Sequence, residues 1–512
     1  MKKNSQIPLF LLVIFIGLFS SLTYWIGINQ GKILSPESSQ NKWSSINVVL
    51  DNLLSNYVDS LDSYELSENS INNILKDLDP HSSFIPATKR QSVNESLVGH
   101  FGGIGIRFMI YNDTLTIVDV IEGGPSKLAG LKKRDRIIKI EDENFAGIGI
   151  KNEDVLKKLK GKVGSAVNIT VLNPNNNIVE HTLLRGSIPL KSITASTILK
   201  NNIGYIKLSS FSNSSDLEFK DAIFELKNQG MEKLIFDLRF NGGGYLHQAI
   251  NISDEFLKED QLIVYTKGAH SKKRSFYSRS KGLFEEGELI VLVNSSTASA
   301  SEIVSGALQD NNRGQILGRR TFGKGLVQQP LMLPDSSELR ITTSRYYTPS
   351  GKCIQKPYGE NIDYDNDIFE RIESGELTQN DSNYDKSIFK GGILPDIYSP
   401  IDTLDYSQAI NNIIYTRNWR DFCFSYFEKY PYPKELNTKD FYKNFKIETK
   451  ELEKYFEENG KNIGKYKPKE ISDLKWSLKI ELSSYYFSEQ SRYILNTFRD
   501  SDVKKAIEEM SN

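Results

Sequence analysis

The sequence predicts a multidomain α+β protein with four parts: an N-terminal transmembrane helix, a small β-rich module, an α/β core and a helical C-terminal domain. Three observations lead to this prediction: an uncharged run near the N-terminus, a series of short β-type segments broken by glycine, and a later alternation of buried strands with helices. The 512 residues can form more than one core, because single domains rarely grow beyond about 250–300 residues.

The uncharged run spans residues 7–28 and follows Lys2 and Lys3. It is long enough to cross the roughly 30 Å hydrocarbon core of a bilayer as a helix. No A-x-A cleavage site follows it, which favours a retained anchor over a removed signal. By the positive-inside rule we expect residues 1–30 to anchor the protein in the membrane, with everything after about residue 30 on the extracytoplasmic (periplasmic) side. Residues 31–97 are predicted to form a tether followed by short helices.

Residues 98–186 contain the β-type segments "GIGIRFMI", "TLTIVDVI", "DRIIKI" and "AVNITVL", together with a helical segment, "NEDVLKKLK". Their spacing predicts a small β-rich module. Residues 187–401 alternate buried strands such as "KLIFDLRF" and "ELIVLVN" with helices, which is typical of an α/β core. Within them the polar run 357–390 is expected to be a surface excursion. Residues 402–512 carry helical patterns without strand alternation and are predicted to form a helical C-terminal domain.

The composition excludes some partners and cofactors. There are 64 Lys and Arg against 65 Asp and Glu, so no strong overall field attracts a polyanion, and we expect no nucleic-acid partner. Cys353 and Cys423 are the only cysteines and lie in no zinc-binding spacing. We therefore expect neither a metal nor another cofactor.

Lys324 lies between two glycines in "GRRTFGKGLVQQPLML". The segment nearly matches a phosphate-binding loop, but Gly325 replaces the required Ser or Thr, and a β-like run follows where such a loop needs a helix. The other interpretation is that Lys324 acts as the base for a serine nucleophile, which requires an environment that keeps the amine neutral.

The serine would be expected after a buried strand, at the entrance to a helix. "ELIVLVNSSTASASEIV" offers this topology, and the residue types alone do not choose among Ser295, Ser296, Ser299 and Ser301. Helix capping is the structural alternative for such hydroxyl groups, for Ser301 or Thr297 in particular. No histidine lies in a setting typical of a Ser-His-Asp triad.

Four segments together identify a family resemblance: "STASASEIVSGALQD", "GRRTFGKGLVQ", "LIFDLRFNGGGYL" and "YYTPSGKCIQ" resemble the carboxy-terminal processing proteases, the tail-specific S41 family of serine peptidases. The resemblance implies that the α/β core is an S41 protease core. It also implies a Ser-Lys dyad in which Ser299 is the nucleophile, Lys324 the base, and Gln328 the residue that orients the lysine. The oxyanion hole would consist of the amides of Ala300 and Gly243.

The β-rich module resembles a PDZ domain inserted into such a protease, through "FGGIGIRF" and "VIEGGPSKLAGLKKRDRIIKI". A PDZ domain binds a peptide C-terminus as an added strand. The peptide-binding loop would comprise Gly102, Gly103, Ile104, Gly105 and Ile106. Arg134 departs from the family pattern, which usually has glycine there.

These observations predict a serine endopeptidase that recognises protein or peptide substrates by their unstructured, apolar C-termini and cleaves through an acyl-enzyme. The alternative is a catalytically silent, membrane-tethered PDZ scaffold that only binds peptides, and a nucleotide hydrolase ranks third. A homo-oligomer or an adaptor protein is a further partner to consider.

Overall fold

The structure is a computed structural model that describes residues 44–279, 281–359, 362–364, 366–377, 391–401, 406–430 and 438–511. The chain divides into two units, Met1–Asp77 and Leu78–Asn512. In the first, α2 (Ser44–Asn56) and α3 (Ser63–Lys76) are the short helices that the apolar spacing predicts. Asp62 caps α3, because its side chain accepts from the backbone N–H groups of Tyr64 and Glu65.

The prediction of a membrane-anchored protein requires correction. Across the ranges that the structure describes, no helix combines the length and apolar character needed to cross a bilayer. The predicted span, residues 7–28, lies outside the described residues.

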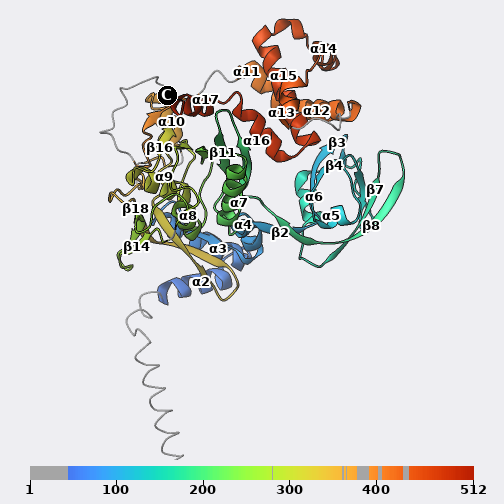
Figure 1. Ribbon diagram of the computed structural model, residues 1–512. Helices are drawn as coiled ribbons and strands as arrows, with labels where there is room; N and C mark the ends of the chain where they lie inside the picture. The colour runs from blue at the N-terminus through green and yellow to red at the C-terminus, as the bar shows by residue number, and fades with distance from the viewer. Residues whose placement is uncertain are drawn as a thin grey trace, which may run out of the picture. The chain divides into compact units, whose positions relative to one another are not determined.

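The β-rich module of the second unit contains an antiparallel sheet, of which β3, β4, β7 and β8 are labelled in Figure 1. Its strands follow the order β3 (Ile106–Tyr111), β4 (Thr114–Val120), β5 (Arg136–Ile140), β7 (Ala166–Leu172) and β8 (Ile178–Leu184), with β6 (Glu143–Asn144) beside β5. Two helices, α5 (Pro125–Leu128) and α6 (Asn152–Leu159), belong to the same module. The chain enters and leaves the module through a two-stranded ladder of β2 (His100–Gly103) and β9 (Gly186–Pro189).

The α/β core contains a sheet in the order β10 (Ile193–Ile198), β11 (Ile203–Leu208), β12 (Lys233–Asp237), β15 (Leu289–Val293), β16 (Gln315–Gly318) and β19 (Ile397–Tyr398). All neighbouring pairs from β11 onward are parallel, and β10 is antiparallel to β11. Every residue of β15 is buried, as expected for a parallel strand covered on both faces.

Successive residues of the core strands point to opposite faces, so the sheet has two apolar layers. On one face, Phe236 and Val291 belong to the cluster that includes residues of α7 (Ser215–Asn228), α8 (Leu246–Asp254) and α9 (Ala300–Asp310). On the other, Ile235 and Ile290 pack with Val503 of α17 (Ser501–Glu509). Helix α17 therefore shares a core with the sheet of the α/β core, and in Figure 1 it lies near β16.

A second sheet follows the order β1 (Ser83–Ile85), β18 (Glu338–Tyr347), β13 (Leu262–Lys267) and β14 (Arg274–Tyr277), and β17 (Leu326–Met332) pairs with β18. The polar run predicted as an insert contains α10 (Asp367–Glu373) in its described part.

The helical C-terminal region has its own aromatic core. Its further helices are α11 (Gln408–Ile414), α12 (Arg417–Lys429), α13 (Thr438–Asn444), α14 (Thr449–Glu458), α15 (Pro468–Tyr486) and α16 (Glu489–Thr497). Val118 of the β-rich module is part of this core, and the rings of Tyr111 and Phe424 lie 5.0 Å apart between centroids. The division of the chain at residue 402 stays a prediction.

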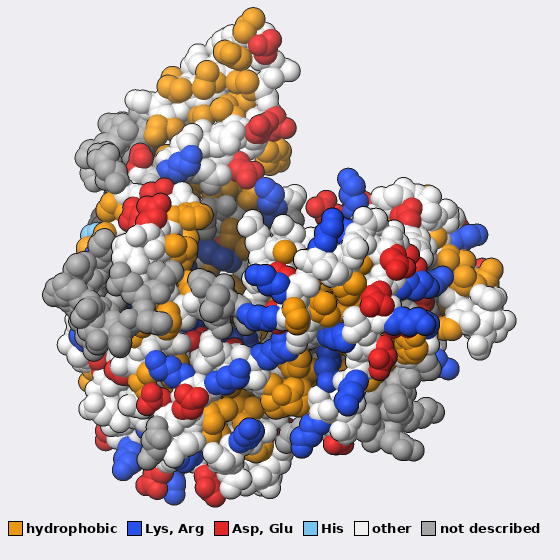
Figure 2. All heavy atoms as spheres, turned by 90° about the horizontal axis from the view of Figure 1, so that it is seen from above, with side chains coloured by type: hydrophobic (Ala, Val, Ile, Leu, Met, Phe, Trp, Pro, Cys, Tyr) orange, Lys and Arg blue, Asp and Glu red, His pale blue; other side chains and the backbone are white. Residues whose placement is uncertain are grey.

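The surface carries both signs of charge. Figure 2 shows basic and acidic side chains intermixed over the face that it draws. This distribution agrees with the formal net charge of −1.

Candidate active site

Ser299 lies at the junction between the loop that follows the buried strand β15 and the first turn of α9. Its backbone angles are φ 58° and ψ −116°. A non-glycine residue with positive φ is strained, and such strain is often found where a nucleophile is presented at a sharp strand-to-helix turn. The side chain is half-buried, so the hydroxyl group lies in a restricted but accessible position.

The hydroxyl groups of two neighbouring residues, in contrast, donate hydrogen bonds to backbone carbonyl oxygens. Ser301 is buried and its Oγ donates to the carbonyl oxygen of Asn241 at 3.0 Å. Thr297 is also buried and donates to the carbonyl oxygen of Leu238 at 3.0 Å. These bonds join the serine loop, residues 294–299, and the first turn of α9 to residues 238–244, which contain the glycine loop 240–244. The geometry therefore favours Ser299 over Ser301 as the reactive serine.

Gly243 packs directly against Ser299. A Cβ atom built on Gly243 would lie 2.7 Å from Cβ of Ser299 and 3.0 Å from the nitrogen of Ala300, so only glycine fits here. The Ala300 amide is at the first position of α9, where backbone N–H groups lack helical acceptors. The Gly243 amide, however, donates to Oδ1 of Asn241 at 2.9 Å. This bond would have to open before Gly243 could stabilise an oxyanion.

Lys324 lies in the loop between β16 and β17, which also contains Gly323 with φ 92°. The loop leads into a strand and not into a helix, so it lacks the helix N-terminus on which a phosphate-binding loop depends. The neighbouring Phe322 amide donates to the carbonyl oxygen of Thr297 at 2.9 Å. The lysine loop is thus hydrogen-bonded to the serine loop.

Glu302 connects the two loops most closely, and sequence reasoning gave it no role. Its buried carboxylate accepts at Oε2 from the amides of Ser299 and Lys324, both at 2.8 Å. Oε1 accepts from the Gly323 amide at 2.7 Å and from the Thr321 hydroxyl at 2.5 Å. Burial raises the pKa of Glu302, while these four donors act in the opposite direction. A single carboxylate therefore fixes the backbone of both predicted dyad residues.

Tyr346 holds the same two residues from another side. Its hydroxyl lies within hydrogen-bonding distance of the carbonyl oxygens of Ser299, at 3.1 Å, and of Lys324. The tyrosine is 2% exposed and lies on β18. No pattern in the sequence connects this residue to the loops.

Burial lowers the pKa of Lys324 below its ordinary value, and the positive charge of Arg340 lowers it further. Asp79 and Glu302 act in the opposite direction. The direction of the shift increases the neutral fraction of the amine, as a general base requires. Within the described residues no hydrogen bond joins Nζ of Lys324 to Oγ of Ser299. The structure brings the two backbones together without that side-chain contact.

Gln328 lies on β17, and its side-chain amide donates to Oγ1 of Thr342 on β18 at 3.2 Å. The backbone N–H of Thr342 donates in turn to Oγ of Ser82 at 3.1 Å. The same Ser82 hydroxyl donates to Oδ2 of Asp79 at 2.6 Å. The predicted contact between Gln328 and Lys324 is not among the hydrogen bonds of the described chain.

The segment "DPHS", residues 79–82, supplies further groups near the lysine. Nε2 of His81 lies 2.8 Å from Oη of Tyr364. Burial and the charge of Lys324 lower the pKa of His81 to about 4. The imidazole is therefore neutral at pH 7.

In its described part, the polar run 357–390 is not only the surface excursion that its composition predicts, because Tyr364 is buried. It is 9% exposed, and its ring lies 5.8 Å from that of Phe322 in the lysine loop. Glu376 forms an ion pair with the buried Arg320 at 2.8 Å, and Arg371 donates to the Arg320 carbonyl oxygen at 2.6 Å. The described part of this run supports the lysine loop through buried charged side chains that form ion pairs with one another.

The predicted peptide-binding loop belongs to the β-rich module. Gly102 and Gly103 pair with β9, and Ile104 is 2% exposed. Gly105 has φ 77° and precedes Ile106, the first residue of β3. Among the described strands, β3 pairs only with β4, so its other edge can accept an added strand.

Metal-binding clusters of His, Cys, Asp and Glu do not occur among the described residues. The groups that the structure gathers around Ser299 and Lys324 include backbone amides, hydroxyl groups and the Glu302 carboxylate, and the charges of Asp79 and Arg340 act on the lysine.

Comparison with known proteins identifies the family. Residues 202–367 match the model of Peptidase family S41, and residues 102–181 match that of the PDZ domain. The chain is 34% identical over 312 residues to a carboxy-terminal-processing protease of Bartonella bacilliformis, covering 60% of this chain and 71% of the relative. It is 30% identical over 355 residues to the carboxy-terminal processing protease CtpA of Bacillus subtilis, covering 69% and 75%. The chain therefore belongs to the carboxy-terminal processing proteases, the serine-type peptidases of family S41 that carry a PDZ domain.

Proposed function

We propose that this protein is an endopeptidase that binds the C-terminal tail of its substrate at the PDZ domain and cleaves with a Ser299–Lys324 dyad. The observation that carries the proposal is the shared attachment of both residues to Oε2 of Glu302, combined with the strained backbone of Ser299. Two flexible side chains can act on one another only if their backbones are held in a fixed relation.

The reaction begins when neutral Lys324 removes the proton from the Ser299 hydroxyl as the oxygen attacks the scissile carbonyl carbon. This step requires Nζ of Lys324 to reach Oγ of Ser299. The Ala300 amide stabilises the developing oxyanion. Gly243 contributes a second N–H once its bond to Asn241 opens. Gln328 orients the lysine if its side chain exchanges Thr342 for Nζ.

Collapse of the tetrahedral species breaks the C–N bond, and Lys324 passes its proton to the leaving amine. The product is an ester between Ser299 and the acyl part of the substrate. Water then loses a proton to the same lysine and attacks this ester, and Ser299 regains a proton as the acid product leaves.

The PDZ domain supplies substrate recognition. A free peptide C-terminus adds as a strand to the open edge of β3, and its carboxylate binds to amides of the loop 102–106. The apolar side chains around Ile104 and Ile106 favour an apolar tail.

The test uses the full chain, Ser299→Ala and Lys324→Ala, each mixed with an unfolded polypeptide that ends in apolar residues. Products are identified by mass spectrometry, and tail binding is measured in parallel. Cleavage by the wild-type chain alone is expected. If all three cut equally, the dyad assignment is wrong. If none cuts but all bind the tail, the protein is a binding scaffold.

A further inference from the structure

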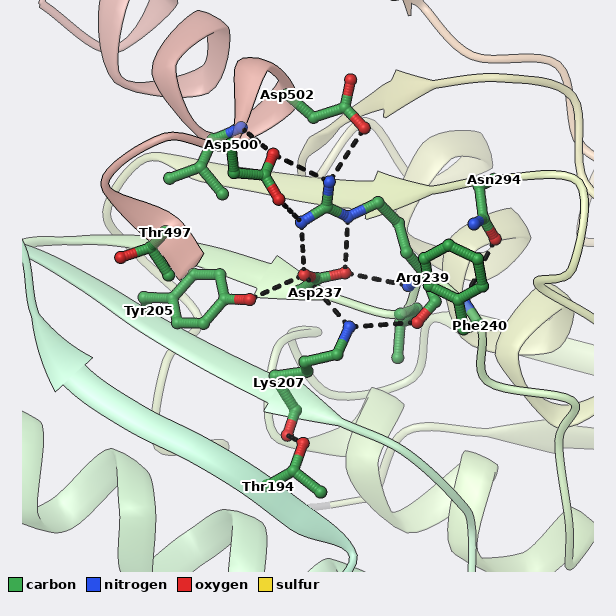
Figure 3. Close-up of polar contacts among 12 residues, drawn as sticks. Thr194, Tyr205, Lys207, Asp237, Arg239, Phe240, Asn294, Thr497, Asp500 and Asp502 are labelled. Atoms are coloured by element: carbon green, nitrogen blue, oxygen red, sulfur yellow. Dashed lines mark hydrogen bonds and ion pairs between the residues drawn. The ribbon is translucent and has the colours of Figure 1, made fainter. Parts of the chain in front are cut away.

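A cluster of buried charges lies at the ends of the core strands, where they meet the N-terminus of α17 (Figure 3). We name this the α17 charge cluster. Its members are Lys207, Asp237, Arg239, Arg319, Asp500 and Asp502. Three are basic and three are acidic, so the cluster is balanced within itself. Figure 3 shows Asp500 and Asp502 of the C-terminal segment pointing toward the guanidinium group of Arg239.

Arg239 uses all five of its side-chain N–H groups within this cluster. Asp237 accepts from Nε at 3.0 Å and from Nη2 at 2.7 Å. Asp500 accepts from Nη1 at 2.9 Å and from Nη2 at 2.8 Å. Nη1 also donates to Oδ2 of Asp502 at 2.9 Å. With the side chain 9% exposed, this guanidinium group cannot exchange a lost partner for bulk water.

Asp502 joins Arg239 to a second arginine. Its Oδ2 accepts from Nη2 of Arg319 at 3.0 Å in addition to the bond from Arg239. Its Oδ1 accepts from Nη1 of Arg319 at 3.2 Å and from the Ser399 hydroxyl at 2.6 Å. Burial raises the pKa of Asp502, but the charges of Arg319 and Arg239 outweigh this and hold the pKa below its ordinary value. The side chain, 3% exposed, is thus an ionised bridge between two strand ends.

The two arginines stand where the two loops of the active site begin. Arg239 precedes the glycine loop 240–244, in which Gly243 packs against Ser299. Arg319 directly follows β16 and begins the lysine loop, residues 319–325, which contains Lys324. Residues 500–502 lie outside both family matches, which end at residues 181 and 367.

We propose that Asp502 is a positioning residue of the protease: it fixes the glycine loop and the lysine loop in register with each other, so that the C-terminal segment completes the active site. Asp500 supports the same arrangement, but of the two arginines it contacts only Arg239, and hence only the glycine loop. Its remaining side-chain bond, from the Val503 amide at 3.0 Å, caps α17. The predicted effect of Asp502 on catalysis rests on the proposed function, whereas its predicted effect on the two loops does not.

The experiment compares the full chain with Asp502→Asn, Asp500→Asn and Val503→Ala. Val503 is the adjacent buried residue of α17, and its truncation weakens the packing of the helix without touching either arginine. Asparagine at position 500 keeps a good helix cap. Hydrogen–deuterium exchange is followed in peptides covering residues 239–245 and 319–325, and kcat and KM are measured on an apolar-tailed polypeptide.

Asp502→Asn is expected to raise the exchange rate about tenfold in both loops. Asp500→Asn should raise it only in 239–245, and Val503→Ala in neither. The kcat of Asp502→Asn should fall about tenfold with KM within about twofold of wild type. If Asp502→Asn does not fold, the exchange rates of Asp500→Asn decide. Faster exchange in 239–245 alone supports the inference, and unchanged exchange in that loop overturns it.

Equal exchange in the loops of Asp502→Asn and Val503→Ala would overturn the inference, as would an unchanged kcat in Asp502→Asn. If the wild-type chain cleaves nothing, the proposed function fails, and the exchange rates alone decide the role of Asp502.

Discussion

The backbone amides of Ser299 and Lys324 donate to the same carboxylate oxygen, Oε2 of Glu302, at 2.8 Å each. The two residues lie on different loops, one before α9 and one before β17. Because a buried carboxylate that accepts four hydrogen bonds cannot move without breaking them, the loops behave as one rigid part. The proposed roles of the two side chains then depend on the backbone arrangement that the Glu302 carboxylate fixes.

Glu302→Gln should therefore impair both stability and reactivity. The amide has one oxygen instead of two, and its NH₂ group would face N–H and O–H donors. We expect a loss of about 3 kcal/mol in the free energy of unfolding, measured by denaturant titration. The rate at which a fluorophosphonate labels Ser299 should fall about tenfold or more.

Ser305→Ala is the matched control, because Ser305 is buried one turn further along α9. Its hydroxyl donates only within the helix, to the carbonyl oxygens of Ser301 at 2.9 Å and of Glu302 at 3.4 Å, and not to the Glu302 carboxylate. We expect it to cost about 1 kcal/mol and to leave labelling unchanged. Wild-type labelling by Glu302→Gln would contradict the role of the shared carboxylate.

The pH dependence should follow the neutral fraction of Lys324. Burial and then Arg340 lower the pKa of Lys324, and only the neutral amine can accept a proton, so kcat/KM should rise with pH through that pKa and then level off. Arg340→Gln removes a positive charge, which raises the pKa of Lys324. The rising limb should therefore move to higher pH, and the activity at pH 7 should fall.

Arg345→Gln provides the comparison, because Arg345 is an exposed residue of the same strand that bonds to Tyr358. Its profile of kcat/KM against pH should coincide with that of the wild-type chain. If Arg340→Gln leaves the limb in place, Lys324 is not the titrating base.

Where the signal is local, the sequence predicts elements of the fold and identifies candidate residues. The fully apolar "LIVLV" predicts a buried parallel strand, and Ser299 and Lys324 lie in motifs whose residues are close together in the chain. Glu302 was within such a motif, but its bonds to the lysine loop span about twenty residues of sequence and depend on the packing of β16 beside β15.

The contacts of the polar run 357–390 with the lysine loop could not be predicted either, and the reason is different. Its composition is that of a surface loop, yet Glu376 and Arg371 pair with each other and with the lysine loop, and Leu377 is fully buried. The burial of a charged side chain can be predicted only when its ion-pair partners are known. Likewise, a helical pattern at residues 501–509 does not say that Val503 faces the protease sheet.

His81 should make stability depend on pH. Its pKa is about 4 in the folded chain against an ordinary value of 6.5, so the unfolded chain binds a proton more readily. This contribution to stability is fully present above pH 6.5 and is lost as the pH falls toward 4. Between pH 7 and pH 5 it corresponds to about 2 kcal/mol.

Denaturant titrations at the two pH values should show that His81→Gln loses about 2 kcal/mol less than the wild-type chain. His270→Gln, at an exposed position, should lose as much as the wild-type chain. An identical loss in all three proteins would mean that His81 is not held neutral by its surroundings.

At position 134, substitution by glycine should destabilise the protein less than substitution by alanine, which reverses the usual order. Its φ of 74° is left-handed, which costs a side-chain-bearing residue about 1 kcal/mol relative to glycine. Arg134 also donates to the carbonyl oxygen of Phe427 at 2.7 Å and lies 4.5 Å from the centroid of its ring. Both substitutions lose these contacts, but only glycine relieves the strain.

Arg134→Gly is therefore expected to be more stable than Arg134→Ala by about 1 kcal/mol, although both are less stable than the wild-type chain. The free energy of unfolding measures the difference. An alanine variant at least as stable as the glycine variant would show that the turn changes its conformation when the arginine is removed.

Cleavage should depend on a free carboxyl group at the end of the substrate. Among the described strands β3 offers an open edge beside the loop 102–106, and hydrogen bonds from backbone amides to a carboxylate contribute about 1.5–3 kcal/mol. Amidation of the C-terminus removes the charge, so kcat/KM should fall about tenfold or more. N-terminal acetylation of the same polypeptide alters a distant end and should have no effect. Binding to Ser299→Ala, measured without turnover, should weaken by the same factor on amidation. Equal kcat/KM for the free and amidated substrates would separate cleavage from tail recognition, and the PDZ domain would then act on something other than the substrate's C-terminus.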